Sequence, residues 1–216
     1  MKIIILIPIY NDWQSLSKLI EEINSEISAI DCQFSIIILN DGSTERQSMH
    51  VPNIENLRSI KIINFKENRG HQRCSAAGLK YIYEKEEFDY VIPMDGDGED
   101  RPEEIKNFVE HIKFNPNRTI VGERVKRSEG LFFKFCYQFH KYLTLAFTGQ
   151  SIKFGNFSCL SKITVEKMLQ EKATWSSFSG ALVKLEKDRS TVPSIRGKRY
   201  FYPSKMSFNN LVIHSL

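Results

Sequence analysis

The chain has 216 residues, of which 41% are hydrophobic and 26% charged, and it carries a formal net charge of +4. This size and composition predict one folded domain with its own hydrophobic core and exclude a disordered or low-complexity chain. The mild charge also argues against a nucleic-acid partner, because domains that bind nucleic acids carry a more concentrated basic surface.

The four cysteines indicate a reducing compartment. They lie far apart, form no CxxC pair, and so predict neither a zinc site nor a disulfide framework. No uninterrupted apolar run reaches the roughly 18 residues that a membrane-spanning helix needs, and residues 1–9 are too short for a signal peptide. We therefore expect a cytoplasmic chain. The cysteines are Cys32, Cys74, Cys136 and Cys159.

The first hundred residues alternate between continuous apolar runs and segments with helical spacing. Runs without polar alternation are typical of strands buried on both faces of a parallel sheet, and the alternation predicts βαβ units. Asn11 and Asp12 are expected to cap the first helix. In chain order we expect strands at 3–9, 34–39, 60–65 and 90–94, and helices at 12–30 and 74–83.

The second half is less regular. A helix is expected at 102–114, with Pro102 in its first turn, and a short strand at 119–122. Residues 131–147 form an aromatic segment with interleaved lysines, which fits a buried helix or an amphipathic helix at a membrane surface. The tail 206–216 has a helical pattern.

Polar residues follow each expected strand of the first half at the point where it ends. In open α/β sheets, ligands bind outside the carboxyl ends of the strands. We therefore expect these groups to converge on one crevice. They are Tyr10-Asn11-Asp12, Asp41-Gly42-Ser43, Asn68-Arg69-Gly70 and Asp95-Gly96-Asp97.

The pair Asp95 and Asp97 is the central candidate site. Two carboxylates on a strand-end loop hold a hard cation through oxygen ligands, and such a cation completes its shell with substrate phosphates. An Asp-Gly-Asp sequence is often only a turn, but Glu99 and Asp100 add two carboxylates that repel one another without a cation. Asp41 fits a ribose-reading acid or an Asx turn, and Tyr10 fits a base-stacking ring or a core residue.

Four of these motifs stand in the order and spacing of family 2 glycosyltransferases, and the chain resembles in particular the branch that glycosylates dolichyl or polyprenyl phosphate. Two downstream motifs are similar to the G-x-R-x-x-R and G-D-F of that branch. The resemblance covers nearly the whole chain. The motifs are IPIYND (7–12), NDGS (40–43), NRGHQ (68–72), MDGDGEDRPE (94–103), GERVKR (122–127) and GNF (155–157).

The resemblance implies a GT-A fold, a Rossmann-like three-layer α/β arrangement with a mostly parallel sheet, in one domain over 1–216. Residues 1–100 would be the nucleotide-binding half and 101–216 the acceptor side. It further implies an inverting hexosyltransferase that uses Mg²⁺ or Mn²⁺ and a UDP- or GDP-sugar at the cytoplasmic face of the membrane. The membrane-spanning tail usual in the family is expected to be missing after Leu216.

The resemblance also assigns site residues by position. Asp97 and Glu99 would bind the metal, and Asp95, Asp97 and Arg124 would be catalytic. Arg199 and Lys205 would meet the acceptor or a phosphate. The nucleotide-sugar would be bound by Pro8, Tyr10, Asn11, Asp12, Asp41, Ser43, Asn68, Gly70, Asp95, Arg124 and Arg127.

Departures from the family pattern bear on the acceptor. Asn156 stands where the branch commonly has Asp, and Ser158 where it commonly has Arg. Asn cannot act as a base, and a phosphate acceptor needs none because it is already ionised near neutrality. The missing base favours a lipid-phosphate acceptor, whereas the missing Arg disfavours it.

Other functions stay open at this point. Transfer to a sugar hydroxyl of a cell-surface glycan would use the same donor site. A nucleotide-binding protein without transferase activity would keep the fold. A nucleotidyltransferase would share the sheet and carboxylates, but it should carry a Gly- and Lys-rich phosphate loop where this chain has Tyr10-Asn11-Asp12.

Overall fold

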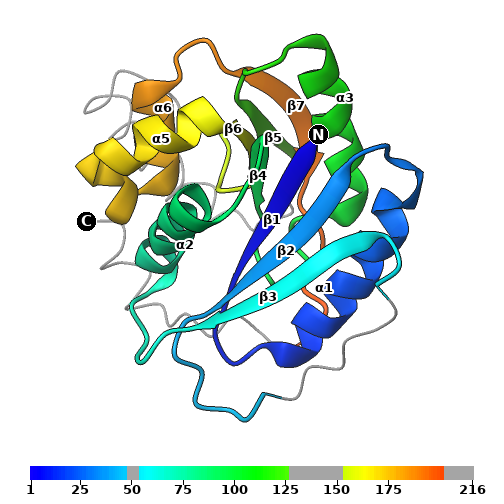
Figure 1. Ribbon diagram of the computed structural model, residues 1–216, viewed down its shortest axis with the longest axis vertical. Helices are drawn as coiled ribbons and strands as arrows, with labels where there is room; N and C mark the ends of the chain where they lie inside the picture. Colours follow the sequence, from blue (N-terminus) through cyan, green and yellow to red (C-terminus); the bar gives the residue numbers. More distant parts are fainter. Residues whose placement is uncertain (48–53, 127–152, 202–216) are drawn as a thin grey trace.

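The structure is a computed structural model that describes residues 1–47, 54–126 and 153–201. The described strands are β1 (Lys2–Ile9), β2 (Gln33–Asn40), β3 (Leu57–Asn64), β4 (Tyr90–Pro93), β5 (Ile120–Lys126), β6 (Ser158–Ser161) and β7 (Ser190–Ile195). They form one sheet in the order β3-β2-β1-β4-β6-β5-β7, shown in Figure 1. The neighbouring strands β3, β2, β1 and β4 run parallel to one another, and β5 runs parallel to β7. Strand β6 is antiparallel to both of its neighbours, β4 and β5.

Strand β1 is the centre of the parallel half. All its side chains from Ile3 to Ile9 are buried, because β2 and β4 flank it and helices cover both faces. Burying such an isoleucine contributes roughly 1.5–3 kcal/mol relative to leaving it exposed. The continuous apolar run therefore specifies a central strand, and the parallel pairing puts the carboxyl ends of β1, β2 and β4 at one edge.

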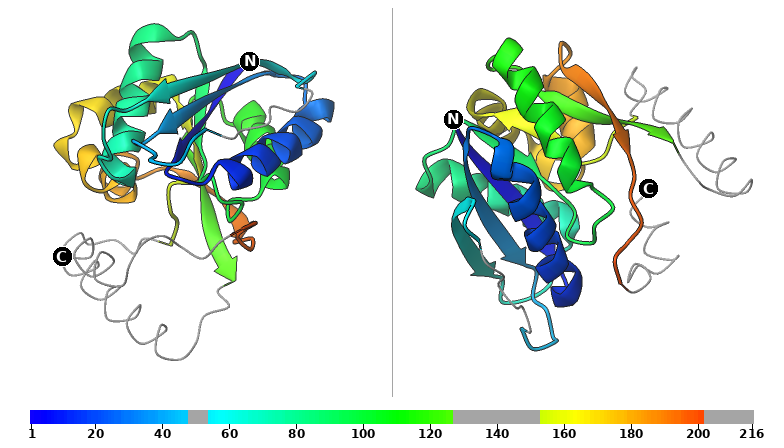
Figure 2. Two further views of the ribbon diagram at one scale, coloured as in Figure 1. Left: turned by 90° about the horizontal axis from the view of Figure 1, so that it is seen from below. Right: turned by 90° about the vertical axis from the view of Figure 1, so that its right-hand side faces the viewer.

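Helices pack on both faces of the sheet and give three layers (Figure 2). Helices from the two halves of the chain share each face, as Figure 2 shows. No helix of the described ranges is long and apolar enough to cross a membrane. The α-helices are α1 (Trp13–Glu26), α2 (His71–Lys85), α3 (Ile105–Phe114), α5 (Lys162–Gln170) and α6 (Phe178–Leu185), and the 3-10 turns are η1 (Ile27–Ala29), η2 (Pro102–Glu104) and η3 (Lys172–Trp175).

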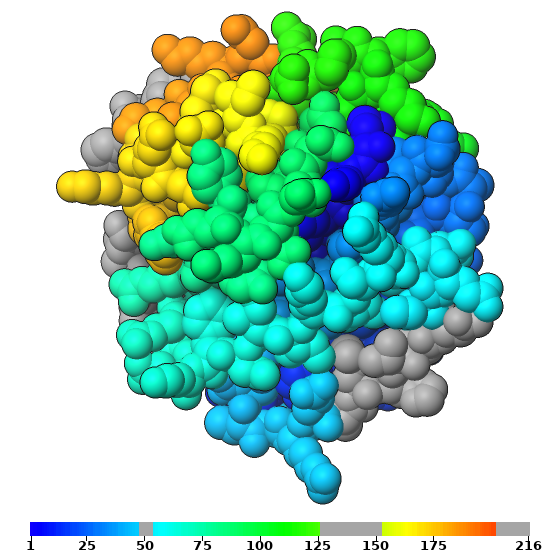
Figure 3. Space-filling model, viewed as in Figure 1, coloured from blue at the N-terminus to red at the C-terminus, as the bar shows by residue number. Residues whose placement is uncertain are grey.

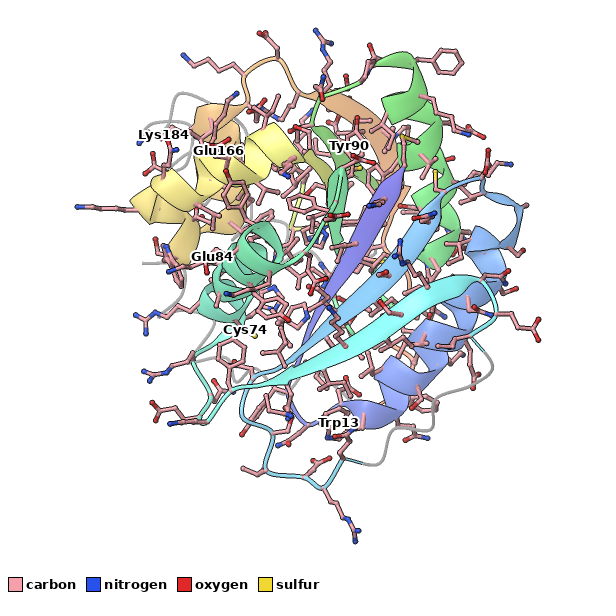
Figure 4. The ribbon with its side chains drawn as sticks, in the orientation of Figure 1. Trp13, Cys74, Glu84, Tyr90, Glu166 and Lys184 are labelled. Carbon is pink, nitrogen blue, oxygen red and sulfur yellow. The ribbon has the colours of Figure 1, made fainter. Side chains whose placement is uncertain are left out.

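The two faces have separate cores. Trp13 and Leu16 of α1 pack with Phe108 of α3 on one face, and α2, α5 and α6 bury their apolar stripes on the other. Figure 4 shows Trp13 at the start of α1 and Cys74 between α2 and the sheet. This arrangement confirms the predicted α/β class with a mostly parallel sheet.

The helix α2 approaches the sheet closely at Gly78. A Cβ added there would lie 2.4 Å from a methyl carbon of Leu39 and 2.8 Å from one of Leu6. A side chain at this position would force those two leucines to move. The close contact brings the middle of α2 against β1 and β2.

The predicted elements that the structure describes differ from it mainly at their limits, whereas β6, α5, α6 and β7 were not predicted. The first helix ends at Glu26 and continues as η1, and the second begins at His71, three residues earlier than expected. The predicted side-chain cap of α1 is wrong, because the Asp12 side chain makes no cap hydrogen bond and pairs with Arg199 instead. The segments 131–147 and 206–216 lie outside the described residues.

A groove of about 330 Å³ opens on the α2 face at the amino ends of β1, β2 and β3. Figure 3 shows this face, with β1 in dark blue between α2 and β3. Two lysines that line the groove, Lys2 and Lys61, are paired with Glu87 and Glu86. The groove lies at the opposite end of the strands from the predicted motifs, so it is not the site described next.

Candidate active site

The turn after β1 is tied to the turn after β2 by Asn11. Its side-chain oxygen accepts hydrogen bonds from the backbone N–H groups of Thr44 and Glu45 at 2.8 and 3.0 Å, and its backbone N–H donates to Ser43 Oγ at 2.9 Å. Asn11 has a positive φ of 51°, which Asn tolerates better than most residues. Asn11 and Ser43, both predicted to bind the nucleotide, thus fix the shape of the two turns.

Asp41 connects the end of β2 to the start of α2. It is 4% exposed, and its two carboxylate oxygens accept hydrogen bonds from the backbone N–H groups of Arg69 and Gly70 at 2.8 and 2.9 Å. Asn68 Oδ1 also accepts from the Gly70 N–H, at 3.1 Å. Asp41, Asn68 and Gly70 therefore form one structural unit beside the predicted nucleotide site.

Two other predicted residues, one in β1 and one directly after it, differ in their exposure. Pro8 is buried within the strand, where it pairs with Leu39 of β2. Tyr10, the first residue after β1, is 39% exposed. Its ring is available to a ligand, which agrees better with a stacking role than with a core role.

The loop after β4, residues 95–100, is here named the carboxylate loop. Asp100 is buried, and its Oδ2 accepts a hydrogen bond from the Asp95 N–H at 2.9 Å; Asp97 Oδ1 accepts one from the Glu99 N–H at the same distance. Gly96 packs against Ile7 and Ile9, where a Cβ would lie 2.8 Å from Ile9. The loop is thus held by its own carboxylates against the end of β1.

Burial and mutual repulsion perturb these acids. Burial, and then the charge of Asp95, raise the pKa of Asp97 to about 6, although Arg199 and Arg196 oppose the shift. The same two causes raise the pKa of Asp100 well above its ordinary range. The surroundings therefore disfavour the ionised forms of both acids.

Residues 196–201, here named the basic segment, follow β7 and lie across the carboxylate loop. Arg199 pairs with Asp97 and also, at 3.4 Å, with Asp12, while Arg196 pairs with Glu99. Two backbone hydrogen bonds, Gly197 N–H to Glu99 O at 2.8 Å and Tyr200 N–H to Asp97 O at 3.0 Å, run between the segments. Both predicted metal ligands are consequently paired with a guanidinium.

Arg124 reaches the site from β5. Its guanidinium lies against Gly155, where a Cβ would be 2.6 Å from Nη2, and its charge lowers the pKa of Asp100 against the effect of burial. The predicted phosphate ligand Arg124 thus lies on the side of the carboxylate loop that faces the GNF motif. Arg127 and Lys205, the other predicted basic ligands, lie outside the described residues.

The donor set at the strand ends fits a hard divalent cation. Asp12 Oδ1 and Asp95 Oδ1 are buried, and neither forms a hydrogen bond with the described residues. Mg²⁺ and Mn²⁺ prefer such oxygen ligands. Within the described ranges no cluster of three or more acidic, histidine or cysteine ligands occurs, so water and substrate phosphates would have to complete the shell.

His71 is a site residue that the sequence reasoning did not single out. Its Nε2 lies 2.5 Å from Asn156 Nδ2 and 3.5 Å from Asp95 Oδ1, so it bridges the carboxylate loop and the GNF motif. It lies within the NRGHQ motif (68–72), and its place in that motif was the available signal. Tyr200 and its partner Glu22 were also missed, because 178 residues separate them.

The comparisons with known proteins agree with this geometry. The profile of glycosyl transferase family 2 matches residues 4–173, so the chain belongs to that family. It is similar to two proteins named undecaprenyl-phosphate 4-deoxy-4-formamido-L-arabinose transferase: 25% identical to that of Klebsiella pneumoniae (strain 342) and 26% to that of Salmonella choleraesuis (strain SC-B67). The alignments cover 98% of this chain and 64% of each relative.

A solved structure shares the fold. The glucosyl-3-phosphoglycerate synthase of Mycobacterium tuberculosis, in complex with Mn²⁺, UDP-glucose and phosphoglyceric acid, has a TM-score of 0.67 at 13% identity. The match covers 99% of this chain and 76% of that one. The predicted GT-A fold is thereby confirmed.

Proposed function

We propose that this chain is an inverting glycosyltransferase that uses a divalent cation to transfer a sugar from a UDP- or GDP-sugar to a polyprenyl phosphate. The observation that carries the proposal is the carboxylate loop at the carboxyl edge of the sheet, in a chain of family 2. One buried carboxylate oxygen on this loop, of Asp95, and one after β1, of Asp12, make no hydrogen bond with the described residues, and this edge of the sheet is where ligands bind in such folds.

On the donor side, the chain would bind the nucleoside between the turns after β1 and β2. Tyr10 offers an exposed ring for stacking. Asn11, Ser43 and Asp41 hold these turns through their hydrogen bonds, which keeps the binding surface in place without ligand. Pro8 supports it from within β1.

The diphosphate would lie over the carboxylate loop. Asp97 and Glu99 would hold the cation, whose charge stabilises the departing nucleoside diphosphate. Arg124 is close enough to influence Asp100, and a guanidinium binds phosphate oxygens through two parallel hydrogen bonds. We also place Arg127, Arg199 and Lys205 on the phosphates of donor or acceptor, and one domain over 1–216 with a donor half and an acceptor half.

The acceptor is proposed from chemistry and from the relatives. The GNF motif carries an amide, Asn156, in place of a carboxylate, and Ser158 is fully buried in β6, where its hydroxyl donates to Asn156 O. A phosphate acceptor requires no base. The two curated relatives are named for undecaprenyl phosphate, and such an acceptor would bring the protein to the cytoplasmic face of a membrane.

One observation favours a second acceptor class. The imidazole of His71 lies beside Asp95, and a histidine next to a carboxylate is a competent general base for a hydroxyl. A sugar hydroxyl of a glycan is therefore the alternative acceptor. The remaining alternative function is nucleotide binding without transferase activity.

The test is a transfer assay with matched acceptors. The purified chain, Mn²⁺ and a panel of UDP- and GDP-sugars are incubated with undecaprenyl phosphate or undecaprenol in detergent, or with an oligosaccharide. Mass spectrometry should detect a glycosylated lipid phosphate, and EDTA should abolish its formation. Product only with the oligosaccharide would support the alternative acceptor, and no product with any acceptor would contradict transferase activity.

A further inference from the structure

Tyr200 joins three parts of the molecule that are far apart in sequence. Its ring covers Gly98 of the carboxylate loop, where an added Cβ would lie 2.4 Å from ring carbons, and its backbone N–H donates to Asp97 O. Its hydroxyl donates to the carboxylate of Glu22, and the Nζ of Lys18 lies 4.5 Å from the ring centroid. The ring is thus held between α1 and the carboxylate loop.

The residues around Tyr200 suit this contact. Glu22 and Lys18 are one turn apart on α1 and pair with each other at 3.7 Å, so they present a carboxylate and a cation to one ring. Burial, and then the Glu22 carboxylate, raise the pKa of the Tyr200 hydroxyl, which therefore keeps its proton and remains a donor. The contact is maintained across the neutral pH range.

Gly98 makes room for the ring. Its φ of +86° is a left-handed conformation that side chains rarely adopt, and any side chain there would collide with Tyr200. The conformation of the carboxylate loop and the position of Tyr200 consequently depend on each other.

The guanidiniums next to Tyr200 occupy the carboxylates assigned to the cation. Arg199 precedes Tyr200 directly and pairs with Asp97, and Arg196 pairs with Glu99. A long arginine side chain loses rotamer freedom when it is held in one geometry. Anchoring the backbone at Tyr200 reduces the further entropy lost when these ion pairs form.

We infer that Tyr200 is a positioning residue that anchors the basic segment over the carboxylate loop, so that Arg196 and Arg199 compete with the cation for Asp97 and Glu99 and remain within reach of the donor phosphates. This inference rests on the proposed function. It makes two predictions of opposite sign. Loosening the anchor should strengthen the binding of the cation alone and weaken the binding of nucleoside diphosphate with cation.

The test uses Tyr200→Ala, the milder variants Tyr200→Phe and Glu22→Gln, and Tyr83→Phe as a matched control. Tyr83 also interacts with a glutamate, Glu166, but on helices α2 and α5. Mn²⁺ binding is measured by electron paramagnetic resonance, and UDP or GDP binding at saturating Mn²⁺ by calorimetry. Thermal unfolding of each variant confirms that it is folded.

For Tyr200→Ala we expect a Kd for Mn²⁺ on the order of fivefold lower, because the arginine–carboxylate pairs compete less with the cation. We expect a Kd for the nucleoside diphosphate on the order of fivefold higher, because the guanidiniums are no longer held in place for the phosphates. Tyr200→Phe and Glu22→Gln should change both constants in the same directions by less. A purely structural role would weaken both kinds of binding together, and that result, or unchanged constants, would overturn the inference.

Limited proteolysis gives a readout that needs no cation. Trypsin should cleave after Arg196, Lys198 and Arg199 several-fold faster in Tyr200→Ala than in the wild-type chain or Tyr83→Phe, as followed by mass spectrometry. If the wild-type chain binds neither Mn²⁺ nor nucleotide, the proposed function fails, and unchanged cleavage rates would separately refute the anchor.

Discussion

Asp97 carries an unfavourable charge that the replacement Asp97→Asn should remove. Its side chain is 13% exposed, and burial together with Asp95 raises its pKa from 3.8 to about 6. At pH 7 the ionised carboxylate therefore costs the folded state roughly 3 kcal/mol relative to the unfolded chain. The opposing charge of Arg199 is already part of this pKa shift, so the figure includes the loss of that ion pair.

We expect the cation-free Asp97→Asn variant to be more stable than the wild-type chain by about 1–2 kcal/mol at pH 7, below the full figure because a carboxamide does not match the protonated carboxyl that it replaces. This gain corresponds to roughly 2–8 °C in Tm for a chain of this size. The carboxamide oxygen of Asn can still accept the hydrogen bond from the Glu99 N–H. If Asp97 is a metal ligand as proposed, the same variant should lose the stabilisation that we expect Mn²⁺ and a nucleoside diphosphate to give the wild-type chain.

The pH dependence has a definite sign. Since the folded pKa of Asp97 lies above its unfolded value, the folded state takes up a proton between about pH 6 and 3.8, and the destabilisation is fully present above that window. The stability advantage of Asp97→Asn should therefore shrink as the pH falls through 6 towards 4.

The assay is thermal unfolding in EDTA at pH 7 and pH 5, and again with Mn²⁺ and UDP or GDP at pH 7. The exposed Asp188→Asn is the matched control, since it removes one carboxylate charge away from the carboxylate loop. A destabilised Asp97→Asn in EDTA would refute the argument about charge. A variant that still gains wild-type stability from Mn²⁺ and nucleotide would refute the metal assignment.

Three further predictions concern other parts of the structure. Arg124→Ala should raise the Kd of the nucleoside diphosphate about tenfold and leave that of the nucleoside unchanged, because a guanidinium contact serves the phosphates; equal losses in calorimetry would contradict this. Asp41→Ala should lower the free energy of unfolding by about 2–4 kcal/mol in urea denaturation, because the buried carboxylate of Asp41 accepts two charge-assisted hydrogen bonds, from the backbone N–H groups of Arg69 and Gly70; a loss below that of an exposed control such as Asp31→Ala would contradict the structural role. In a Cys136→Ser background, the buried Cys74 and Cys159 should resist alkylation at pH 8, because burial raises the pKa of both thiols, while the half-buried Cys32 reacts. Equal labelling of the three cysteines, read by mass spectrometry, would contradict this and show that the cores open readily.

The first half of the fold could be predicted from sequence because its strands are buried on both faces. Runs such as β1 are continuous and apolar, so the type of element and its limits are clear. Strands β6 and β7 have weaker patterns: β6 has only four residues, and β7 contains Pro193, which suits an edge strand but resembles a loop in sequence. The short strand and the proline account for the two missed strands, but not for helices α5 and α6, which were missed as well.

The site was predictable where its residues follow a strand directly. The carboxylate loop and the turn at Asp41 stand where the pattern placed them. The hydrogen bonds of Asn11 and Asp41, by contrast, depend on how neighbouring turns meet, and a motif does not specify whether a polar side chain faces a ligand or another turn. The contacts of Arg199 with Asp12 and Asp97 join residues more than a hundred positions apart, which no local pattern reports.

The most direct test of the carboxylate loop as a cation-dependent donor site is calorimetric titration of the wild-type chain with UDP, GDP, CDP and dTDP, each with and without Mn²⁺. We predict that UDP or GDP binds, that binding requires Mn²⁺, and that it disappears in Asp97→Asn. Binding of none of the four, or binding of equal strength in EDTA, would contradict the assignment of this loop.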